Sequence, residues 1–138
     1  MQGSTFEREF CNLLSKKGWW VLRIPRNESG AQPFDVIAVN DKFVRCFDCK
    51  VLTSRKSGRF PLDRIEDNQW LAFEAFEQKT KKESACGIAV FYEGNIYVVG
   101  HYFLKRAVNA GVRSIDLRVF KPFLSAQEIE EILGYKLQ

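Results

Sequence analysis

Two short apolar segments of this chain each contain an acidic residue, and the second segment also ends in a lysine. Asp35 follows Phe34 at the start of the first segment, and Asp48 and Lys50 close the second, which spans 43–50. A carboxylate in an apolar strand is costly unless a cation or hydrogen bonds compensate its charge. Two acids and a lysine on neighbouring strands therefore indicate a site that holds a divalent metal ion against a phosphate group.

A β-hairpin would bring these three side chains to one side of a sheet. Asn40-Asp41 is a candidate two-residue turn, which would place Asp35 opposite Cys46. Side chains alternate along a strand and opposed residues share a face, so Asp35, Asp48 and Lys50 would point the same way, with Asp35 diagonal to Asp48. A loop with an odd number of residues would reverse Asp35, so this prediction depends on an even loop length.

The pattern of apolar and turn residues predicts the elements that would position this site. We expect helices at 4–17, 63–80, 102–110 and 126–133, and strands at 19–24, 34–39, 43–50, 86–91 and 95–99. A strand–helix–strand crossover favours parallel pairing, so the expected fold class is α/β, with a mixed five-stranded central β-sheet flanked by helices. We expect a single domain over residues 1–138, with a core at about 4–100 and a C-terminal helical extension at about 101–138.

Capping residues and apolar stripes refine the helix predictions. Ser4 or Thr5 would cap the first helix, and Ser125 and Gly134 would bound the last one. The first helix would bury a stripe formed by Phe6, Phe10, Leu13 and Leu14. The apolar surface of the second helix would come from Ile65, Trp70, Leu71, Phe73 and Phe76.

Each candidate site residue also has a simpler interpretation. Glu7 borders the apolar stripe of the first helix and can reach the sheet edge, but solvated acids are common near helix N-termini. Asp35 could cap a turn at the start of a strand, and Asp48 with Lys50 could form an exposed ion pair. Gln69, on the second helix, could be an ordinary surface residue. From the residues alone, these alternatives stay open.

Composition excludes several classes of protein. Of 138 residues, 46% are hydrophobic, yet no apolar run reaches the roughly 18 residues of a membrane helix. The N-terminus lacks a signal-peptide pattern, so we expect a cytoplasmic protein with reduced cysteines and no membrane partner. Cys46 and Cys49 have a C-x-x-C spacing, but no second close pair completes a zinc site, so we expect no zinc. A net charge of +4 is compatible with a polyanionic partner.

Together these residues resemble the PD-(D/E)xK nuclease superfamily, and more closely its cellular Holliday junction resolvases of the archaeal and RecU types. The likeness covers roughly residues 4–100, and the order and spacing of its segments are more specific than any one motif. It is carried by an acid-Arg-Glu helix with the strand start that follows, by two metal-ligand strands, and by a Phe-Pro-Leu run before a glutamine-bearing helix: residues 6–10, 17–19, 23, 33–38, 47–50, 60–62 and 67–69.

Three features depart from the family pattern. Phe34 separates Pro33 from the first acid, and Asp48 stands where resolvases usually carry Glu. The hairpin also lacks the long stalk of RecU-type proteins, which makes the compact archaeal-type layout the nearer match. The small size and the missing stalk are compatible with a phage-encoded resolvase.

The resemblance implies a metal-dependent endodeoxyribonuclease that resolves four-way DNA junctions by paired phosphodiester hydrolysis and leaves 5′-phosphates. Asp35 and Asp48 would bind Mg²⁺, which Mn²⁺ could replace, with help from the backbone carbonyl of Cys49. Glu7 would bind the metal directly or through water. These four residues form the implied metal site.

Other residues would position the attacking water and the DNA. Lys50 would orient or activate the water and offset phosphate charge, and Gln69 would help position the water or the phosphate. Ser29 matches a resolvase loop serine and would contact the scissile region. Basic residues would bind the backbone of the DNA arms: Arg23, Arg26, Arg55, Lys56 and Arg59.

A four-way junction has two symmetric strands to cut, so we expect a homodimer with two sites. Its interface would involve the second helix or apolar C-terminal residues, although these could equally be ordinary core: Val119, Phe120, Phe123 and Leu124. Three alternatives stay open: another nuclease of the superfamily that acts in restriction, repair or nicking, a non-catalytic nucleic-acid-binding module, and a protein-interaction domain with incidental acids. The last alternative predicts that Asp35 and Asp48 diverge in space.

Overall fold

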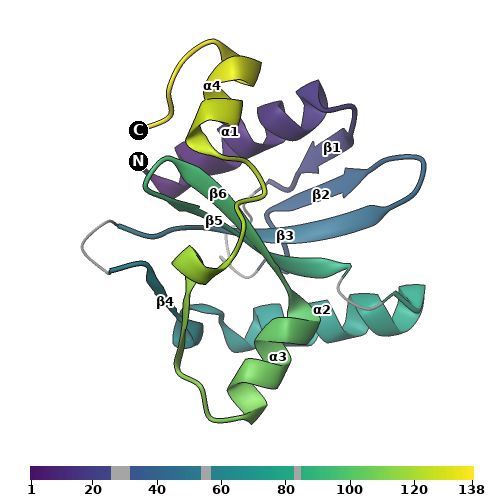
Figure 1. The fold of residues 1–138 in the computed structure, drawn as a ribbon. Helices are drawn as coiled ribbons and strands as arrows, with labels where there is room; N and C mark the ends of the chain where they lie inside the picture. The colour runs from purple at the N-terminus through teal and green to yellow at the C-terminus, as the bar shows by residue number, and fades with distance from the viewer. Residues whose placement is uncertain (26–31, 54–56, 83–84) are drawn as a thin grey trace.

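The structure, a computed structural model, describes residues 1–25, 32–53, 57–82 and 85–138. One sheet has the strand order β1-β2-β3-β5-β6: β1 (Trp20–Arg23), β2 (Val36–Val39), β3 (Val44–Val51), β5 (Cys86–Tyr92) and β6 (Asn95–Gly100). β3 and β5 run parallel, whereas the other neighbouring pairs are antiparallel. The predicted α/β fold with a mixed five-stranded sheet is thereby confirmed (Figure 1).

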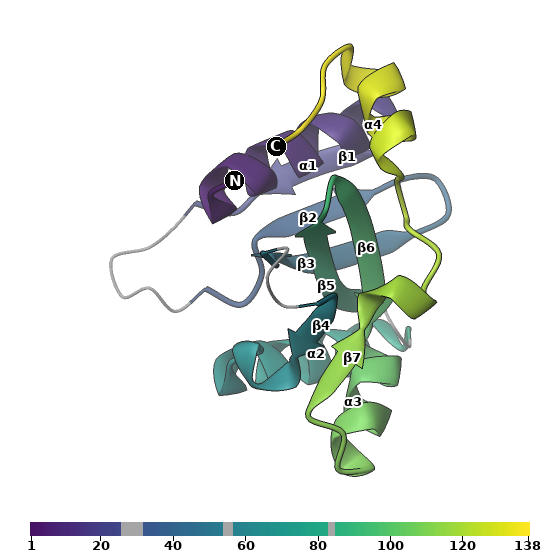
Figure 2. The ribbon, with the colours of Figure 1, turned by 60° about the vertical axis from the view of Figure 1, so that its left-hand side comes forward.

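Helices cover both faces of this sheet (Figure 1, Figure 2). α1 (Gly3–Lys16) and α4 (Ala126–Leu133) lie on one face, and α2 (Asp67–Thr80) and α3 (His101–Asn109) lie on the other. A second sheet pairs β4 (Arg59–Pro61) with β7 (Ser114–Asp116), and two short 3-10 helices follow these strands, η2 (Leu62–Arg64) and η3 (Leu117–Val119). Within the ranges that the structure describes, no helix is long and apolar enough to cross a membrane.

The apolar stripe of α1 forms the core on its face of the sheet. All four of its predicted members are fully buried: Phe6, Phe10, Leu13 and Leu14. Phe10 meets Phe47 of β3 edge to face, with 5.1 Å between the ring centroids. Such aromatic pairs add about 0.5–1.5 kcal/mol beyond their burial. This packing fixes α1 across the sheet and therefore also fixes the position of Glu7, which follows Phe6.

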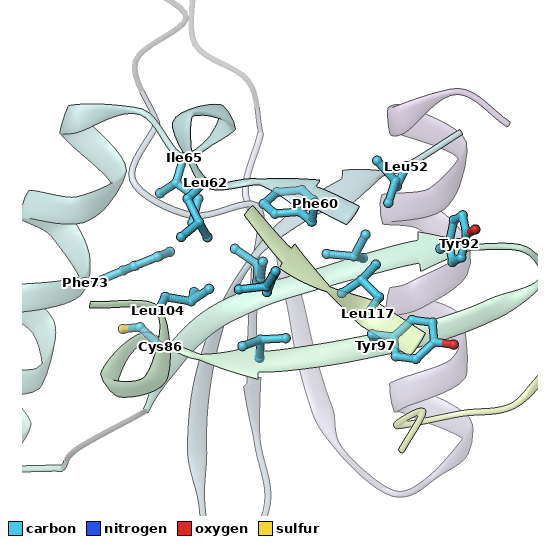
Figure 3. Packing of buried hydrophobic residues seen from close by; sticks show 14 of the residues in the cluster. Leu52, Phe60, Leu62, Ile65, Phe73, Cys86, Tyr92, Tyr97, Leu104 and Leu117 are labelled. Carbon is cyan, nitrogen blue, oxygen red and sulfur yellow. The ribbon is translucent and has the colours of Figure 1, made fainter. Parts of the chain in front are cut away.

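The core on the opposite face joins the sheet to α2, α3 and the small sheet (Figure 3). Phe60 of β4, Phe73 of α2 and Leu104 of α3 are fully buried there. This packing holds the segment after β3 against the sheet. Arg64 of η2 consequently reaches the end of β3, where its Nη1 donates a 2.9 Å hydrogen bond to the carbonyl of Val51.

The β2–β3 hairpin differs from the prediction in its strand register, but its loop still has an even number of residues. Val39 pairs with Val44, so the loop has four residues rather than two. Asn40 closes this loop, since its Oδ1 accepts hydrogen bonds from two backbone N–H groups of the loop at 2.9 and 2.7 Å. Four is also an even number. Cys46 pairs with Ile37 rather than with Asp35, so the predicted register is wrong; the pairing ends at Val36 with Phe47, and Asp35 precedes it by one residue.

Two predicted helix starts are also wrong. α1 begins after Gln2 without a side-chain cap, so neither Ser4 nor Thr5 caps it. α2 begins at Asp67 because η2 occupies the preceding segment and Glu66 provides the cap. Both errors lie at helix ends, where local signals compete.

The predicted bounds of the last helix are confirmed, whereas the predicted burial of one apolar residue on α2 is not. The Ser125 hydroxyl accepts the Glu128 N–H at the start of α4, and Gly134 ends this helix with a φ of +84°. On α2, Phe73 is fully buried as expected, but Leu71 is 67% exposed. Leu71 therefore belongs to the surface of the chain rather than to its core.

Candidate active site

Asp35 precedes β2 and continues its pairing with β3. Its N–H donates to the carbonyl of Phe47 at 2.9 Å, and its Oδ2 accepts the backbone N–H of Cys49 at 2.7 Å. Its other carboxylate oxygen, Oδ1, accepts the side-chain amide of Gln32 at 2.6 Å. The ladder between β2 and β3 does not continue past Asp35, so its carboxylate takes the place of a strand carbonyl and is held against β3.

Phe34 explains how the chain enters this arrangement. Its ring is buried, lies parallel to that of Phe73 with 5.8 Å between centroids, and meets Phe76 edge to face at 5.7 Å. These contacts anchor the residue before Asp35 to α2. The residue that separates Pro33 from the acid is thus a packing anchor.

Asp48 lies in the middle of β3 with 1% of its surface exposed. Lys50 approaches it as an ion pair, with 3.2 Å between Nζ and Oδ2, but the angles do not make a hydrogen bond. No described residue donates a hydrogen bond to this Oδ2, which is fully buried. The Lys50 ammonium compensates the charge of this oxygen, and a carboxylate buried beside a second carboxylate and a cation fits a site for a divalent ion. The interpretation of Asp48 and Lys50 as an exposed pair is therefore wrong.

The electrostatics of Asp48 support the same conclusion. Burial raises the pKa of this carboxyl from 3.8 to about 7, the neighbouring Lys50 ammonium lowers it, and the nearby Asp35 carboxylate raises it. Near neutral pH a bound proton and a divalent cation would compete for this carboxylate. Asp35 and Asp48 converge rather than diverge, so the alternative of a protein-interaction domain with incidental acids is wrong.

Cys49 links the acids through its backbone. Burial raises the pKa of its thiol well above the usual value, and the charges of Asp35, Asp48 and Glu7 raise it further, which places all three acids within electrostatic reach of one residue. The N–H and C=O of a strand residue point to the same side. The Cys49 carbonyl therefore points, like its N–H, to the side where Asp35 lies. The thiols of Cys46 and Cys49 belong to opposite cores, as expected from strand alternation.

Glu7 is buried on α1 and is held by Arg23. The Nε and Nη2 atoms of Arg23 lie 3.3 and 3.1 Å from Glu7 Oε2, and Nη2 also donates to the carbonyl of Ser4 at 3.1 Å. Glu7 is only 3% exposed, so its interpretation as a solvated acid is wrong. Arg23, which we expected to bind DNA, positions this carboxylate in the structure.

The donor set fits a hard, oxygen-preferring cation. In the described parts of the chain, no three His, Cys, Asp or Glu side chains lie close enough together to form a metal site. Two neighbouring carboxylates, one of them almost fully buried, and an adjacent backbone carbonyl nevertheless fit Mg²⁺, which usually takes few protein ligands and keeps several waters. Glu7 then fits an outer position better than direct coordination.

The remaining predicted residues are only partly described. Gln69 is buried, and its Oε1 accepts the Glu66 N–H at 2.9 Å in a reciprocal cap of α2, so its interpretation as a surface residue is wrong. Arg59 lies on β4, where its Nε donates to the hydroxyl of Ser114 at 2.9 Å. Four predicted DNA-binding residues lie outside the described residues: Arg26, Ser29, Arg55 and Lys56.

An open cleft lies beside Glu7. It has a volume of 460 Å³, and its lining includes Glu7 and Arg23. A larger cavity of 590 Å³ lies between α2 and α3 and contains none of the predicted site residues. Its two acids are paired, Glu74 with Lys105 at 2.7 Å and Glu77 with His101 at 2.9 Å. The buried carboxylates rather than the larger cavity identify the candidate site.

Two residues of this region, Gln32 and Arg64, were not predicted from the sequence. Gln32 donates to Asp35, and its spacing three residues before the acid is the only signal that could have indicated it. Arg64 binds the carbonyl of Val51 and places its guanidinium over the ring of Phe60 at 5.4 Å. A basic residue two positions after the Phe-Pro-Leu run could have drawn attention to Arg64.

Comparison with known proteins identifies the family. The model of the archaeal Holliday junction resolvase (Hjc) family matches residues 1–135. No curated protein matches the chain in sequence. Among solved structures, the fold is similar to that of Hjc, a Holliday junction resolvase from the archaeal hyperthermophile Archaeoglobus fulgidus, with a TM-score of 0.62 and 19% identity over 100% of both chains. The chain belongs to the archaeal Holliday junction resolvase family, whose members are metal-dependent nucleases that hydrolyse phosphodiester bonds in DNA.

Proposed function

We propose that this chain resolves four-way DNA junctions with Mg²⁺ held by Asp35 and Asp48, and that Mn²⁺ can replace Mg²⁺. The observation that supports the proposal is the buried carboxylate of Asp48, which lies close to that of Asp35 and whose Oδ2 meets the Lys50 ammonium at 3.2 Å without a hydrogen bond. Family membership supports the reaction, and this oxygen supports the place where it occurs.

Each ligand of the proposed site has a separate role. Asp35 and Asp48 would each supply a carboxylate oxygen, the Cys49 backbone would supply a carbonyl oxygen, and Glu7 would act through an ordered water. When bound, Mg²⁺ supplies Lewis acidity, which makes water a better nucleophile and offsets charge on the phosphate oxygens. Burial of Asp48 keeps competing water away from one side of the site.

Lys50 would orient the attacking water and offset phosphate charge. Its side chain is 15% exposed, and its Nζ lies 3.2 Å from Asp48 Oδ2, which keeps the ammonium beside the carboxylates and partly open to solvent. Gln69 would help position the same water or the phosphate. Its Oε1 is engaged in the helix cap, so this role would fall to its amide nitrogen.

The DNA arms would be bound by basic residues around the site. Arg59 is exposed on β4, and the loop residues Arg26, Arg55 and Lys56, with Ser29, complete the proposed surface. Phosphate contacts of this kind make binding fall steeply with salt. Arg23 would contribute mainly by holding Glu7, because its guanidinium already forms that ion pair.

We further propose a homodimer, because the two symmetric cuts of a junction need two sites. Leu124 is fully buried in the core, so it is excluded from the interface, whereas Val119 is 76% exposed and stays a candidate, as does Leu71 of α2. A single nuclease domain over residues 1–138, a cytoplasmic location and the absence of zinc remain parts of this proposal.

Cleavage of a synthetic four-way junction tests the proposal. The experiment compares the junction with a matched linear duplex, Mg²⁺ with EDTA, and the parent chain with Asp35→Asn. We expect paired nicks in the junction that require Mg²⁺, and a variant that binds the junction without cutting it. Equal cutting of the linear duplex would contradict junction resolution, and cutting in EDTA would contradict the metal mechanism.

A further inference from the structure

Both oxygens of the Asp35 carboxylate accept a hydrogen bond, but the two donors differ in kind. Oδ2 is bound by the backbone N–H of Cys49 at 2.7 Å, whereas Oδ1 is bound by the side-chain amide of Gln32 at 2.6 Å. We propose that Gln32 is a positioning residue, which orients Asp35 and thereby sets the affinity of the site for a divalent cation. This inference rests on the proposed function, because it requires Asp35 to be a metal ligand.

The orientation of Asp35 depends on having two donors. With the Cys49 N–H alone, the carboxylate could still swing about that single hydrogen bond. The second bond from Gln32 fixes the plane of the carboxylate against β3. Each carboxylate oxygen has two acceptor directions, so both oxygens keep a direction for a cation while they accept these bonds.

The chain around Gln32 is built to hold its amide in place. Pro33 fixes its own φ and restricts the preceding Gln32 to extended backbone. The ring of Phe34 is then anchored by contacts with the rings of Phe73 and Phe76, with centroids 5.8 and 5.7 Å away. A proline and a packed aromatic residue therefore separate Gln32 from Asp35. The half-buried Gln32 side chain spans three residues between a stiff segment and the acid.

The neighbouring carboxylate of Asp48 has no donor comparable to Gln32 among the described residues. The Oδ2 atom of Asp48 is buried and accepts no hydrogen bond from a described residue, whereas both Asp35 oxygens are satisfied. The two acids thus differ, with Asp35 oriented by two hydrogen-bond donors and Asp48 Oδ2 held by the Lys50 ion pair without a hydrogen bond. Partners that orient a metal ligand typically change metal affinity by about 10–100-fold when they are mutated.

Mn²⁺ binding measured by calorimetry and by electron paramagnetic resonance tests this role. Gln32→Met keeps the length of the side chain and removes its donor. Gln127→Met is the matched control, because Gln127 also donates to a carboxylate, that of Glu131 at 3.3 Å, but lies on α4. We expect Gln32→Met to weaken Mn²⁺ binding about 10-fold or more. The control should bind Mn²⁺ like the parent.

Two further readouts separate positioning from a structural role. The melting temperature without metal should match the parent, while the stabilisation that Mn²⁺ adds should shrink. Junction cleavage by Gln32→Met should require more metal for half-maximal rate and approach the parental rate at saturating metal. Gln32→Asn, which keeps the amide but shortens its reach, should also weaken Mn²⁺ binding and provides a second, milder variant.

Asp35→Asn distinguishes failure of this inference from failure of the proposed function. If Asp35→Asn loses Mn²⁺ binding while both Gln32 variants bind like the parent, Gln32 is not a positioning residue and the metal site stands. If Asp35→Asn binds Mn²⁺ like the parent, the proposed metal site itself is wrong.

Discussion

At the scale of single residues, the site combines two carboxylates with opposite surroundings. Asp35 accepts hydrogen bonds on both oxygens, whereas Asp48 is buried and its Oδ2 meets the Lys50 ammonium at 3.2 Å without a hydrogen bond. The second arrangement destabilises the metal-free fold. Local rules that are broken in this way commonly mark functional sites. Burial of Asp48 therefore connects the stability of the chain to its proposed catalysis.

Stability of the metal-free protein should fall as the pH rises from about 4 to about 7, because the pKa of Asp48 rises on folding from 3.8 to about 7. In this window the folded state binds more protons than the unfolded state. At about 1.4 kcal/mol for each pH unit, the full effect is about 4 kcal/mol. Asp48→Asn removes this pH-dependent cost but also removes the ion pair with Lys50. We therefore expect a net gain of about 1–3 kcal/mol in the free energy of unfolding near pH 8.

Urea unfolding in EDTA at several pH values measures this effect, and junction cleavage by the same variant should be lost. Asp41→Asn is the control, because Asp41 is an exposed acid of the hairpin loop. It should leave the pH dependence as in the parent. A metal-free Asp48→Asn protein that is less stable than the parent at every pH would contradict the account of a destabilising carboxylate.

At the scale of elements, the close pairing of β5 and β6 keeps the centre of the sheet in place. A Cβ added at Gly87 would lie 2.4 Å from the carbonyl oxygen of Val99. That distance is far too short for a non-bonded contact, so a larger residue would push β6 away from β5. β3, which carries Asp48, is paired with β5 on its other side and would lose its support.

Gly87→Ala should therefore destabilise the fold by about 3 kcal/mol or more, at the upper end of overpacking costs. Gly3→Ala is the matched control, because nothing lies within 4 Å of a Cβ at Gly3, which begins α1. That change should be neutral or should stabilise the protein by up to about 1 kcal/mol. Thermal unfolding measures both variants, and equal melting temperatures would contradict the described packing of β5 on β6.

Much of this element order could be predicted because it depends on local patterns. The stripe of α1, the Ser125 cap and the turn at Glu93-Gly94, which adopts φ values of +48° and +82°, all follow from neighbouring residues. The shared face of Asp35 and Asp48 could be predicted because it requires only an even loop. The loop length itself could not, since it depends on hydrogen bonds that the Asn40 side chain makes within the loop.

The partners of the site residues could be predicted least. Arg23 and Glu7 lie 16 residues apart in sequence, and Asp35 and Cys49 lie 14 apart. Such pairs arise only when the helix and strands have packed, so no local pattern indicates them. The same holds for Leu71, whose exposure depends on how α2 is rotated against the sheet.

At the scale of the whole molecule, the described part of one chain presents a single candidate site, whereas resolution of a junction needs two coordinated cuts. The strongly exposed apolar side chains Val119 and Leu71, at 76% and 67%, are candidates for the surface where two copies meet. We expect sedimentation to give a dimer and the double variant Leu71→Glu/Val119→Glu to give a monomer that nicks junctions singly. Gln78→Glu, an exposed change on α2, should stay dimeric. A dimeric double variant would contradict this choice of interface.

The most direct test of the account is where a divalent ion binds. Crystals of the parent chain soaked in MnCl₂ and measured at a wavelength with strong manganese anomalous scattering would locate the ion. We predict a peak within about 2.5 Å of carboxylate oxygens from both Asp35 and Asp48 and of the Cys49 carbonyl, as expected for a hard cation. An ion bound elsewhere on the chain, with no density between these carboxylates, would contradict the central claim.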